Sequence, residues 1–331
     1  MSADSSLLTC GPEVITQAEI QDWLEFRGRQ ESQGFIDFSG NRETVMERLR
    51  FGPTQSGDSL PWPKTARHIR FRPGELTIWA AANGQGKTSV LSQCLIKWLD
   101  AGPVAVASFE MSLEQLQEKF VRQATGMRCH RQQDERAVHT ALDAIKGRYF
   151  FYDAEKSAFG RIDPEAVLAM AVYAADKLGC KHIVIDSLVK CGLQGYEHQL
   201  YSRQRDFVDR LTWIAKTYKT HIHLVHHMRK GNSEHEPGDK WDVKGGSEIT
   251  DLAHNVVLIW RNKPKERAMQ EAEPGLPAPD VVQAPDNVLT VAKQRHGEWE
   301  GVIALWFDVD SQQFVEARGE PAMAMLPVGG A

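Results

Sequence analysis

The sequence lacks the features that mark disulfide-rich, membrane-spanning and strongly basic proteins. Its five cysteines are scattered, odd in number and without a CxxC pair, which argues against a disulfide framework and against a zinc site. No apolar run approaches the length of a transmembrane helix, and residues 1–6 are polar and lack a signal-peptide core. The formal net charge of −5 excludes a general basic field, so any site for a polyanion must be local. We therefore expect a cytoplasmic protein with no membrane partner.

Length and composition fit one large folded domain with a smaller appendage. The chain has 331 residues, of which 42% are hydrophobic and 25% charged, as in an ordinary globular protein. From residue 74 onward, short apolar segments alternate with amphipathic segments of helical period, which predicts an α/β fold with a mainly parallel, twisted sheet. We place this domain at residues 66–316, a short helical or linker segment at residues 1–65, and a disordered tail at residues 317–331. Residues 263–286 are polar, contain five prolines and are expected to form a mobile loop.

Residues 76–89, LTIWAAANGQGKTS, have the pattern of a phosphate-binding loop. An apolar, β-prone run breaks into a glycine-rich turn and continues as a helical segment, which is the order of elements that this loop requires. Lys87 would reach the β- and γ-phosphates of ATP or another nucleoside triphosphate, and the Thr88 hydroxyl would hold Mg²⁺. Ala81 stands where the GxxxxGK[ST] pattern has glycine, and a chance glycine-rich turn is the alternative interpretation. The other expected contacts of this loop are Asn83, Gly84, Gln85, Gly86 and Ser89.

Two acidic residues follow neighbouring predicted strands. Glu110 comes just after the strand at residues 104–108, so at the carboxyl edge of a parallel sheet it would lie beside the γ-phosphate as general base for water. The alternative for Glu110 is an ordinary acid at a helix N-terminus, because Ser112 follows. Asp186 ends the apolar strand at residues 182–186 and is expected to bind Mg²⁺ through water.

The strand at residues 222–225 leads into the pair His226 and His227. A polar residue at this strand tip can contact the γ-phosphate and report its loss to the loop that follows. The alternatives are surface histidines or a metal site, but adjacent strand residues point to opposite faces, which argues against a shared metal.

Two loops are candidate contacts for single-stranded DNA. The loop at residues 229–247 is polar and locally basic, and a second loop lies at residues 189–200. Solvated surface is the alternative for both loops. The candidate DNA-binding residues are Lys190, Arg229, Lys230, Lys240, Lys244, Gly245 and Gly246.

Lys293 and Arg295 lie in a predicted hairpin between two late strands. Residues two apart on a strand face the same side of the sheet. The pair are surface cations in one interpretation. In a ring-forming ATPase, such a pair instead reaches the γ-phosphate bound by the neighbouring subunit, with the arginine as a finger.

These motifs make residues 62–316 resemble the replicative helicases of the DnaB type, including their phage and Twinkle-like members. The phosphate loop of DnaB also begins with alanine, as with Ala81 here. The segment at residues 108–111, SFEM, is similar to the family's Ser-Leu-Glu-Met, whose Glu is the catalytic carboxylate, and Asp186 matches its Mg²⁺-linked Asp. His227 resembles the sensor histidine of Twinkle-like members, where DnaB has Gln.

The C-terminal half carries the rest of the resemblance. The segment at residues 244–247, KGGS, resembles the one that follows the family's DNA-binding loop, and residues 293–297, KQRHG, are similar to its Lys-Gln-Arg-Asn-Gly. The resemblance implies that Arg295 is the finger given to the adjacent subunit and that Lys293 accompanies it. Arg261 and Phe307 fall where phage members hold the base between an arginine and an aromatic ring.

The resemblance implies a RecA-like P-loop NTPase core that assembles into a ring, with a hexamer expected, and moves 5′ to 3′ on single-stranded DNA. A helix at about residues 15–26 would pack on the next subunit, and a primase, polymerase or loader would be a further partner. The helicase-only arrangement favours a phage or another mobile element, so the compartment is the cytoplasm of a bacterial cell or of a phage-infected host. A RecA- or RadA-like recombinase and a non-unwinding regulatory or loader ATPase remain the alternatives.

Overall fold

The computed structural model describes ten stretches of the chain, which fall into two compact units. The units are Met1–Gln55 and Ser56–Ala331. In the described part of the first unit, β1 (Leu8–Cys10) pairs antiparallel with β2 (Glu13–Ile15), and the helix α2 (Arg42–Phe51) follows. The helix expected at residues 15–26 lies, beyond Ile15, outside the described residues. The described stretches are residues 8–10, 13–15, 40, 42–51, 56–153, 162–193, 195–228, 236–244, 247–271 and 280–327.

The second unit is built on a nine-stranded sheet in the order β11-β10-β9-β8-β3-β7-β6-β4-β5. The six strands from β8 to β5 are parallel to one another, whereas β9, β10 and β11 pair antiparallel at one edge. The predicted α/β class with a mainly parallel sheet is confirmed. The strands are β3 (Leu76–Ala81), β4 (Val104–Ser108), β5 (Tyr149–Phe151), β6 (His182–Asp186), β7 (His221–His227), β8 (Asn255–Arg261), β9 (Asn287–Gln294), β10 (Gly301–Phe307) and β11 (Phe314–Val315).

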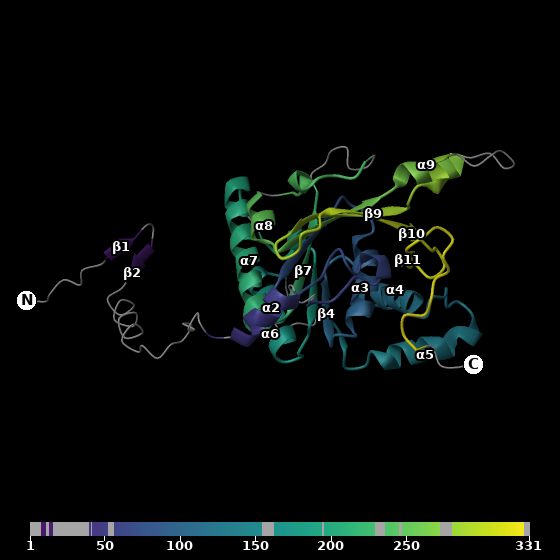
Figure 1. Cartoon of the computed structure of the whole chain (residues 1–331), viewed down its shortest axis with the longest axis horizontal. Coiled ribbons are helices and arrows are strands. Elements are labelled where there is room, and N and C mark those ends of the chain that lie inside the picture. The colour runs from purple at the N-terminus through teal and green to yellow at the C-terminus, as the bar shows by residue number, and fades with distance from the viewer. Residues whose placement is uncertain are drawn as a thin grey trace, which may run out of the picture. The chain divides into compact units, whose positions relative to one another are not determined.

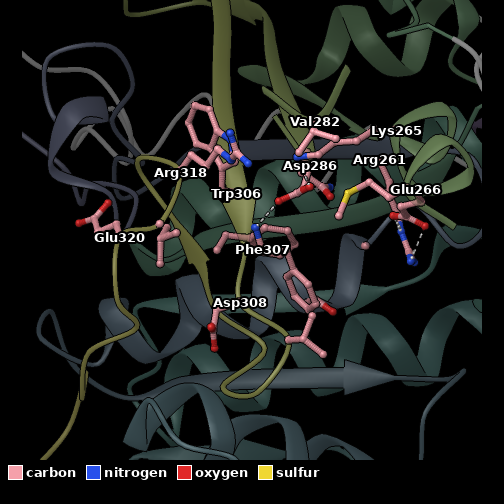
Figure 2. Close-up of a pocket in the computed structure, with 18 residues that line it drawn as sticks. Arg261, Lys265, Glu266, Val282, Asp286, Trp306, Phe307, Asp308, Arg318 and Glu320 are labelled. Carbon is pink, nitrogen blue, oxygen red and sulfur yellow. Dashed lines mark hydrogen bonds and ion pairs between the residues drawn. The ribbon is translucent and has the colours of Figure 1, made fainter. Parts of the chain in front are cut away.

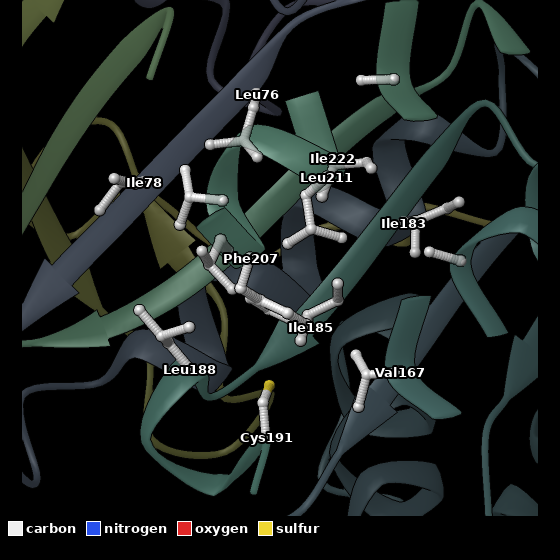
Figure 3. Close-up of a cluster of buried hydrophobic side chains, with 14 of the residues drawn as sticks. Leu76, Ile78, Val167, Ile183, Ile185, Leu188, Cys191, Phe207, Leu211 and Ile222 are labelled. Atoms are coloured by element: carbon white, nitrogen blue, oxygen red, sulfur yellow. The ribbon is translucent and has the colours of Figure 1, made fainter. Parts of the chain in front are cut away.

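Helices cover both faces of this sheet, because the central strands are apolar on both sides. Along β3, Ile78 and Ala80 join a core with α6 and α7, while Trp79 and Ala81 join a second core with α3. Figure 1 shows α7 and α3 on opposite sides of the strands, and Figure 3 shows the first core in detail. The helices are α3 (Lys87–Trp98), α4 (Leu113–Thr125), α5 (Glu135–Ala144), α6 (Pro164–Asp176), α7 (Glu197–Tyr218), α8 (Ser247–Leu252) and α9 (Lys263–Glu271). Short 3-10 turns are η1 (Pro63–Thr65), η2 (Gln132–Asp134), η3 (Leu188–Lys190), η5 (Lys240–Asp242) and η6 (Asp280–Gln283).

A directed chain of hydrogen bonds crosses the second core. Trp79 Nε1 donates to His223 Nδ1 at 3.0 Å, His223 Nε2 is 3.0 Å from His182 Nδ1, and His182 Nε2 is 3.0 Å from Asp58 Oδ2. Since the indole can only donate, His223 must accept at Nδ1 and donate at Nε2, and the same argument makes His182 a donor to Asp58. Both imidazoles are therefore neutral and fully satisfied. This chain fixes the segment around Asp58 to the sheet.

Three segments differ from the sequence prediction. Residues 263–271 form helix α9 within the segment predicted as a mobile loop. The segment before residue 66 contributes Leu60 and Trp62 to the core, so the second unit begins earlier than the predicted boundary. In the predicted disordered tail, the N–H groups of Met325 and Leu326 donate to Ala124 O, which closes the end of α4. Within the described residues, no helix combines the length and apolarity needed to cross a membrane.

Candidate nucleotide-binding and hydrolysis site

The predicted phosphate-binding loop connects β3 to α3 at the carboxyl edge of the parallel strands. Gly84 and Gly86 have φ of 72° and 90°, a left-handed conformation that favours glycine, and Gly86 is the N-cap of α3. The helix begins at Lys87, so its first backbone N–H groups lack intrahelical acceptors and point toward the loop. An N-terminus of this kind, wrapped by a glycine-rich turn, is suited to binding a phosphate.

The Lys87 ammonium lies inside this turn and is only 7% exposed. Its Nζ donates to Ala81 O at 3.2 Å and to Ala82 O at 3.0 Å. Burial lowers the pKa of Lys87, whereas the negative charges of Asp186 and Glu110 raise it. The two carboxylates thus favour the charged form of Lys87. Phosphate oxygens at this position would be stronger hydrogen-bond acceptors for it than the carbonyls of Ala81 and Ala82.

Thr88 and Asp186 form the next part of the site. Thr88 Oγ1 donates to Asp186 Oδ2 at 2.9 Å, and Asp186 is 3% exposed at the end of β6. Burial raises the pKa of Asp186 to about 6, against the opposing effects of the Thr88 hydrogen bond and Lys87. A hydroxyl and a carboxylate oxygen are ligands that Mg²⁺ prefers, so this pair fits the ion. Among the described residues, no group of three or more His, Cys, Asp or Glu side chains could hold a metal alone, and phosphates and water would have to complete the coordination.

Glu110, Ser187 and His227 meet beside Lys87. Ser187 Oγ donates to Glu110 Oε1 at 3.2 Å, and His227 Nε2 lies 3.6 Å from the same carboxylate oxygen. Ser187 Oγ is also 3.5 Å from His227 Nε2. Burial is the main cause that lowers the pKa of His227, with Lys87 adding to it and Glu110 opposing it. Sequence reasoning missed Ser187, although its place directly after Asp186 was the available signal.

The two adjacent histidines face different ways, as predicted from the strand geometry. His226 is buried, and its Nε2 bonds to Lys244 O, while His227 turns toward Glu110. Burial lowers the pKa of His226 to about 4. The Lys244 N–H donates to His227 O at 2.9 Å, and Met228 pairs with Val243 in an isolated bridge. Residues 243–244 are thereby joined to the strand that carries His227.

The candidate DNA-binding residues divide between described and undescribed parts of the chain. Lys190 ends η3, just after β6, and is exposed, as is Lys244. Lys240 begins η5 and is partly buried. The other four candidates, Arg229, Lys230, Gly245 and Gly246, lie outside the described residues.

Lys293 and Arg295 point to the same side, as their spacing predicts. Lys293 Nζ donates to Thr250 O at 2.8 Å and to Asp251 O at 2.9 Å, and Arg295 Nη2 donates to Asp251 O at 2.7 Å. These hydrogen bonds run to α8, not to the phosphate-binding loop of the same chain. The geometry leaves both cations on the part of the surface formed by the end of β9 and α8.

A cavity of about 610 Å³ opens beside the phosphate-binding loop (Figure 2). Gly86 and Ser89 line it on the loop side, and Arg261 and Phe307 are among its other walls. Arg261 forms a bidentate ion pair with Glu266 at 2.5 and 3.0 Å. This volume lies in the range of small-molecule sites. Lining residues that sequence reasoning missed include Lys265, Met269, Asp286, Trp306, Phe314 and Arg318.

Gln85 ties the loop to the far side of this cavity. Its side chain is 1% exposed, and its Oε1 accepts a hydrogen bond from the Arg261 N–H. Its backbone carbonyl accepts from Asn287 Nδ2 at 3.2 Å. The phosphate-binding loop is therefore held to β8 and β9, the strands that lead into the cavity walls.

Comparison with known proteins adds a family and a fold. A family model described as an AAA domain matches residues 47–233, which is more than half of the chain. A solved DnaB-like replicative helicase, studied with its interactions with primase, superposes with a TM-score of 0.66 at 14% identity and covers 90% of this chain and 71% of its own. The ATPase domain of G40P superposes with the same TM-score and identity and covers 83% of this chain and 97% of its own. The chain thus has the RecA-like P-loop fold of these structures.

Proposed function

The chain belongs to the AAA domain family, and from this premise we propose that it is an ATP-dependent DNA helicase of the DnaB type. In this proposal the protein forms a ring, with six subunits expected, and moves 5′ to 3′ on single-stranded DNA while it separates the duplex. The fold shared with a DnaB-like replicative helicase and with the G40P ATPase domain supports it. A primase, polymerase or loader is the kind of partner we expect.

One observation carries the ATPase part of the proposal: four strand ends bring a lysine, a hydroxyl–carboxylate pair and a carboxylate–histidine pair to one edge of the sheet. Lys87 and Thr88 follow β3, Glu110 follows β4, Asp186 ends β6 and His227 ends β7. Because these strands are parallel, their carboxyl ends meet there. This set has the parts that phosphoryl transfer to water requires.

We assign the chemical step to Glu110. Its carboxylate would take a proton from the attacking water as the water oxygen bonds to the γ-phosphorus, and the bond from that phosphorus to the bridging oxygen of ADP breaks. Ser187 and His227 contact one oxygen of the carboxylate, which fixes its orientation. Lys87 would move from the carbonyls of Ala81 and Ala82 to the β- and γ-phosphates. Thr88 and Asp186 would hold Mg²⁺, which would offset the charge of those phosphates.

The nucleotide base would occupy the 610 Å³ cavity next to the loop. The planar guanidinium of Arg261 is oriented by its bidentate pair with Glu266, and the Phe307 ring packs against the Phe314 ring with centroids 5.0 Å apart. A planar cation and an aromatic ring in fixed positions are suited to stacking on a base.

Coupling to DNA would run through the end of β7. His227 lies beside Glu110, and its backbone carbonyl accepts a hydrogen bond from the Lys244 N–H. A movement of His227 on loss of the γ-phosphate would therefore be passed to residues 240–244 through this hydrogen bond. Lys190 lies after β6, at the same edge. Lys293 and Arg295 would act on the nucleotide of the adjacent subunit, which makes the ring necessary for hydrolysis.

The test is unwinding of a forked duplex with ATP and Mg²⁺, compared with duplexes that carry only a 5′ or only a 3′ tail. We expect strand separation that needs the 5′ tail, and no separation by Lys87→Ala. DNA-stimulated hydrolysis without separation would contradict the helicase assignment and favour a loader. Filaments on DNA in negative-stain images would instead indicate a recombinase.

A further inference from the structure

An exposed tryptophan lies beside the candidate DNA-binding lysines. Trp241 is the middle residue of η5 and its side chain is 65% exposed. The Lys240 Nζ lies 5.5 Å from the centre of the Trp241 ring, so a cation accompanies the aromatic face. A single exposed indole is common on protein surfaces, so a role for Trp241 depends on the cations around it.

The turn that carries Trp241 is well held. Asp239 and Asp242 cap it reciprocally: the Asp239 N–H donates to Asp242 Oδ2 at 2.8 Å, and Asp239 Oδ1 accepts from the Lys240 N–H. Val243 then pairs with Met228, and the Lys244 N–H bonds to His227 O. Trp241 is therefore presented on a hydrogen-bonded turn, and the two residues after Asp242 are joined to the end of β7.

Cations near Trp241 come from more than one element, and Asp239 and Asp242 of the same turn lie among them. Lys240 directly precedes Trp241, and Lys244 follows it three positions later. Lys293 on β9 is close enough to Lys240 for that charge to contribute to the lowering of the Lys293 pKa, after burial and Arg295. Arg295 bonds to Asp251 O, as Lys293 does. Aromatic rings set among lysines and arginines are the means by which proteins bind single-stranded nucleic acid, with stacking for the bases and charge for the phosphates.

We propose that Trp241 stacks on a base of the single-stranded DNA. The position of η5, and with it that of the Trp241 ring, would change with the nucleotide state that His227 senses. The inference rests on the proposed function and adds a base contact to it. Stacking of this kind is tolerant of sequence, because every base offers a π-face. Lys240 and Lys244 would bind the phosphates on either side.

The experiment measures binding of a fluorescein-labelled oligo-dT by anisotropy in the presence of a non-hydrolysable ATP analogue. Trp241→Ala should weaken binding about 10-fold or more, and Trp241→Phe should stay within about 3-fold of the wild type, because a phenyl ring still stacks. Trp213→Ala is the matched control, since Trp213 on α7 is 61% exposed and should leave binding unchanged. Thermal unfolding of each variant verifies its fold.

A second oligonucleotide separates stacking from other causes. On a strand of the same length with abasic sugars, the wild type and Trp241→Ala should bind with equal affinity, because no base remains to stack. If Trp241→Ala lost affinity equally for both strands, stacking would be overturned. It would also be overturned if Trp241→Ala bound DNA like the wild type but changed its oligomeric state in size-exclusion chromatography, because this would indicate a contact between subunits. Absence of oligo-dT binding by the wild type would overturn the proposed function itself, and with it this inference.

Discussion

Thr88 Oγ1 lies 2.9 Å from Asp186 Oδ2, and this hydrogen bond joins the end of β6 to the first turn of α3. The carboxylate is buried, and its charge is stabilised by a single hydroxyl and by Lys87. Without a bound cation, keeping this buried carboxylate ionised lowers the free energy of unfolding. The same side chain that the proposed metal site requires is therefore expected to destabilise the fold.

The first prediction is that Asp186→Asn abolishes hydrolysis and raises stability. The pKa of Asp186 rises from 3.8 to about 6 on folding, so its contribution to stability is present below about pH 4 and is lost as the pH rises to about 6. At about pH 8 the neutral amide should add up to about 3 kcal/mol to the free energy of unfolding, while Mg²⁺-dependent turnover disappears. Denaturant unfolding without metal measures the first effect, with exposed Asp209→Asn on α7 as control. A lower unfolding free energy for Asp186→Asn would contradict the argument.

The second prediction concerns the serine between the proposed base and sensor. Ser187 is fully buried, and its hydroxyl is the donor that orients Glu110. Ser187→Ala should lower kcat for ATP about 10-fold, with little change in KM, because orientation of the base matters in the transition state and not in nucleotide binding. Ser92→Ala is the matched control, since Ser92 is buried on α3 and its hydroxyl has no hydrogen-bond partner among the described residues. Equal kcat values for the two variants would remove Ser187 from the site.

The sequence was sufficient to predict the sheet class and the strand ends that converge, because both follow from local periodicity and from short motifs. Glu110 and Asp186 could be placed at one edge since parallel strands end together. The walls of the cavity could not be predicted in this way: Gly86 and Phe314 meet there although more than two hundred positions separate them. Helix α9 was missed because prolines in and after residues 263–271 suggested a loop, whereas Pro264 stands in the first turn, where the missing N–H is tolerated.

The third prediction uses the buried histidines of the second core. His182 and His223 are neutral, and a second proton on either ring would point at a group that already donates a hydrogen bond to it. Burial lowers the pKa of both histidines, and the charge of Asp58 opposes this effect only at His182. Unfolded histidines protonate near pH 6.5, so the stability they contribute is present above that pH and is lost as the pH falls below it.

Each of these histidines should add about 1.4 kcal/mol per pH unit to the fall in unfolding free energy below about pH 6. His223→Gln should make that fall shallower, although the variant is less stable at neutral pH. Exposed His139→Gln on α5 is the control and should reproduce the wild-type pH dependence. A pH dependence of His223→Gln as steep as that of the wild type would show that other groups are responsible.

The last prediction tests whether Arg295 acts on a neighbouring subunit. Arg295→Ala should bind nucleotide and assemble, yet hydrolyse ATP at least about 100-fold more slowly, because an arginine finger acts in the transition state. Mixing it with Glu110→Gln should restore turnover, since about a quarter of the interfaces in a randomly mixed ring would combine an intact Glu110 with an intact Arg295 from the next subunit. The matched control mixes Arg295→Ala with the double variant Glu110→Gln/Arg295→Ala, which offers no arginine and should restore nothing. Turnover that stays low in both mixtures would mean that Arg295 serves its own chain, where it bonds to Asp251 O on α8 and braces the end of β9.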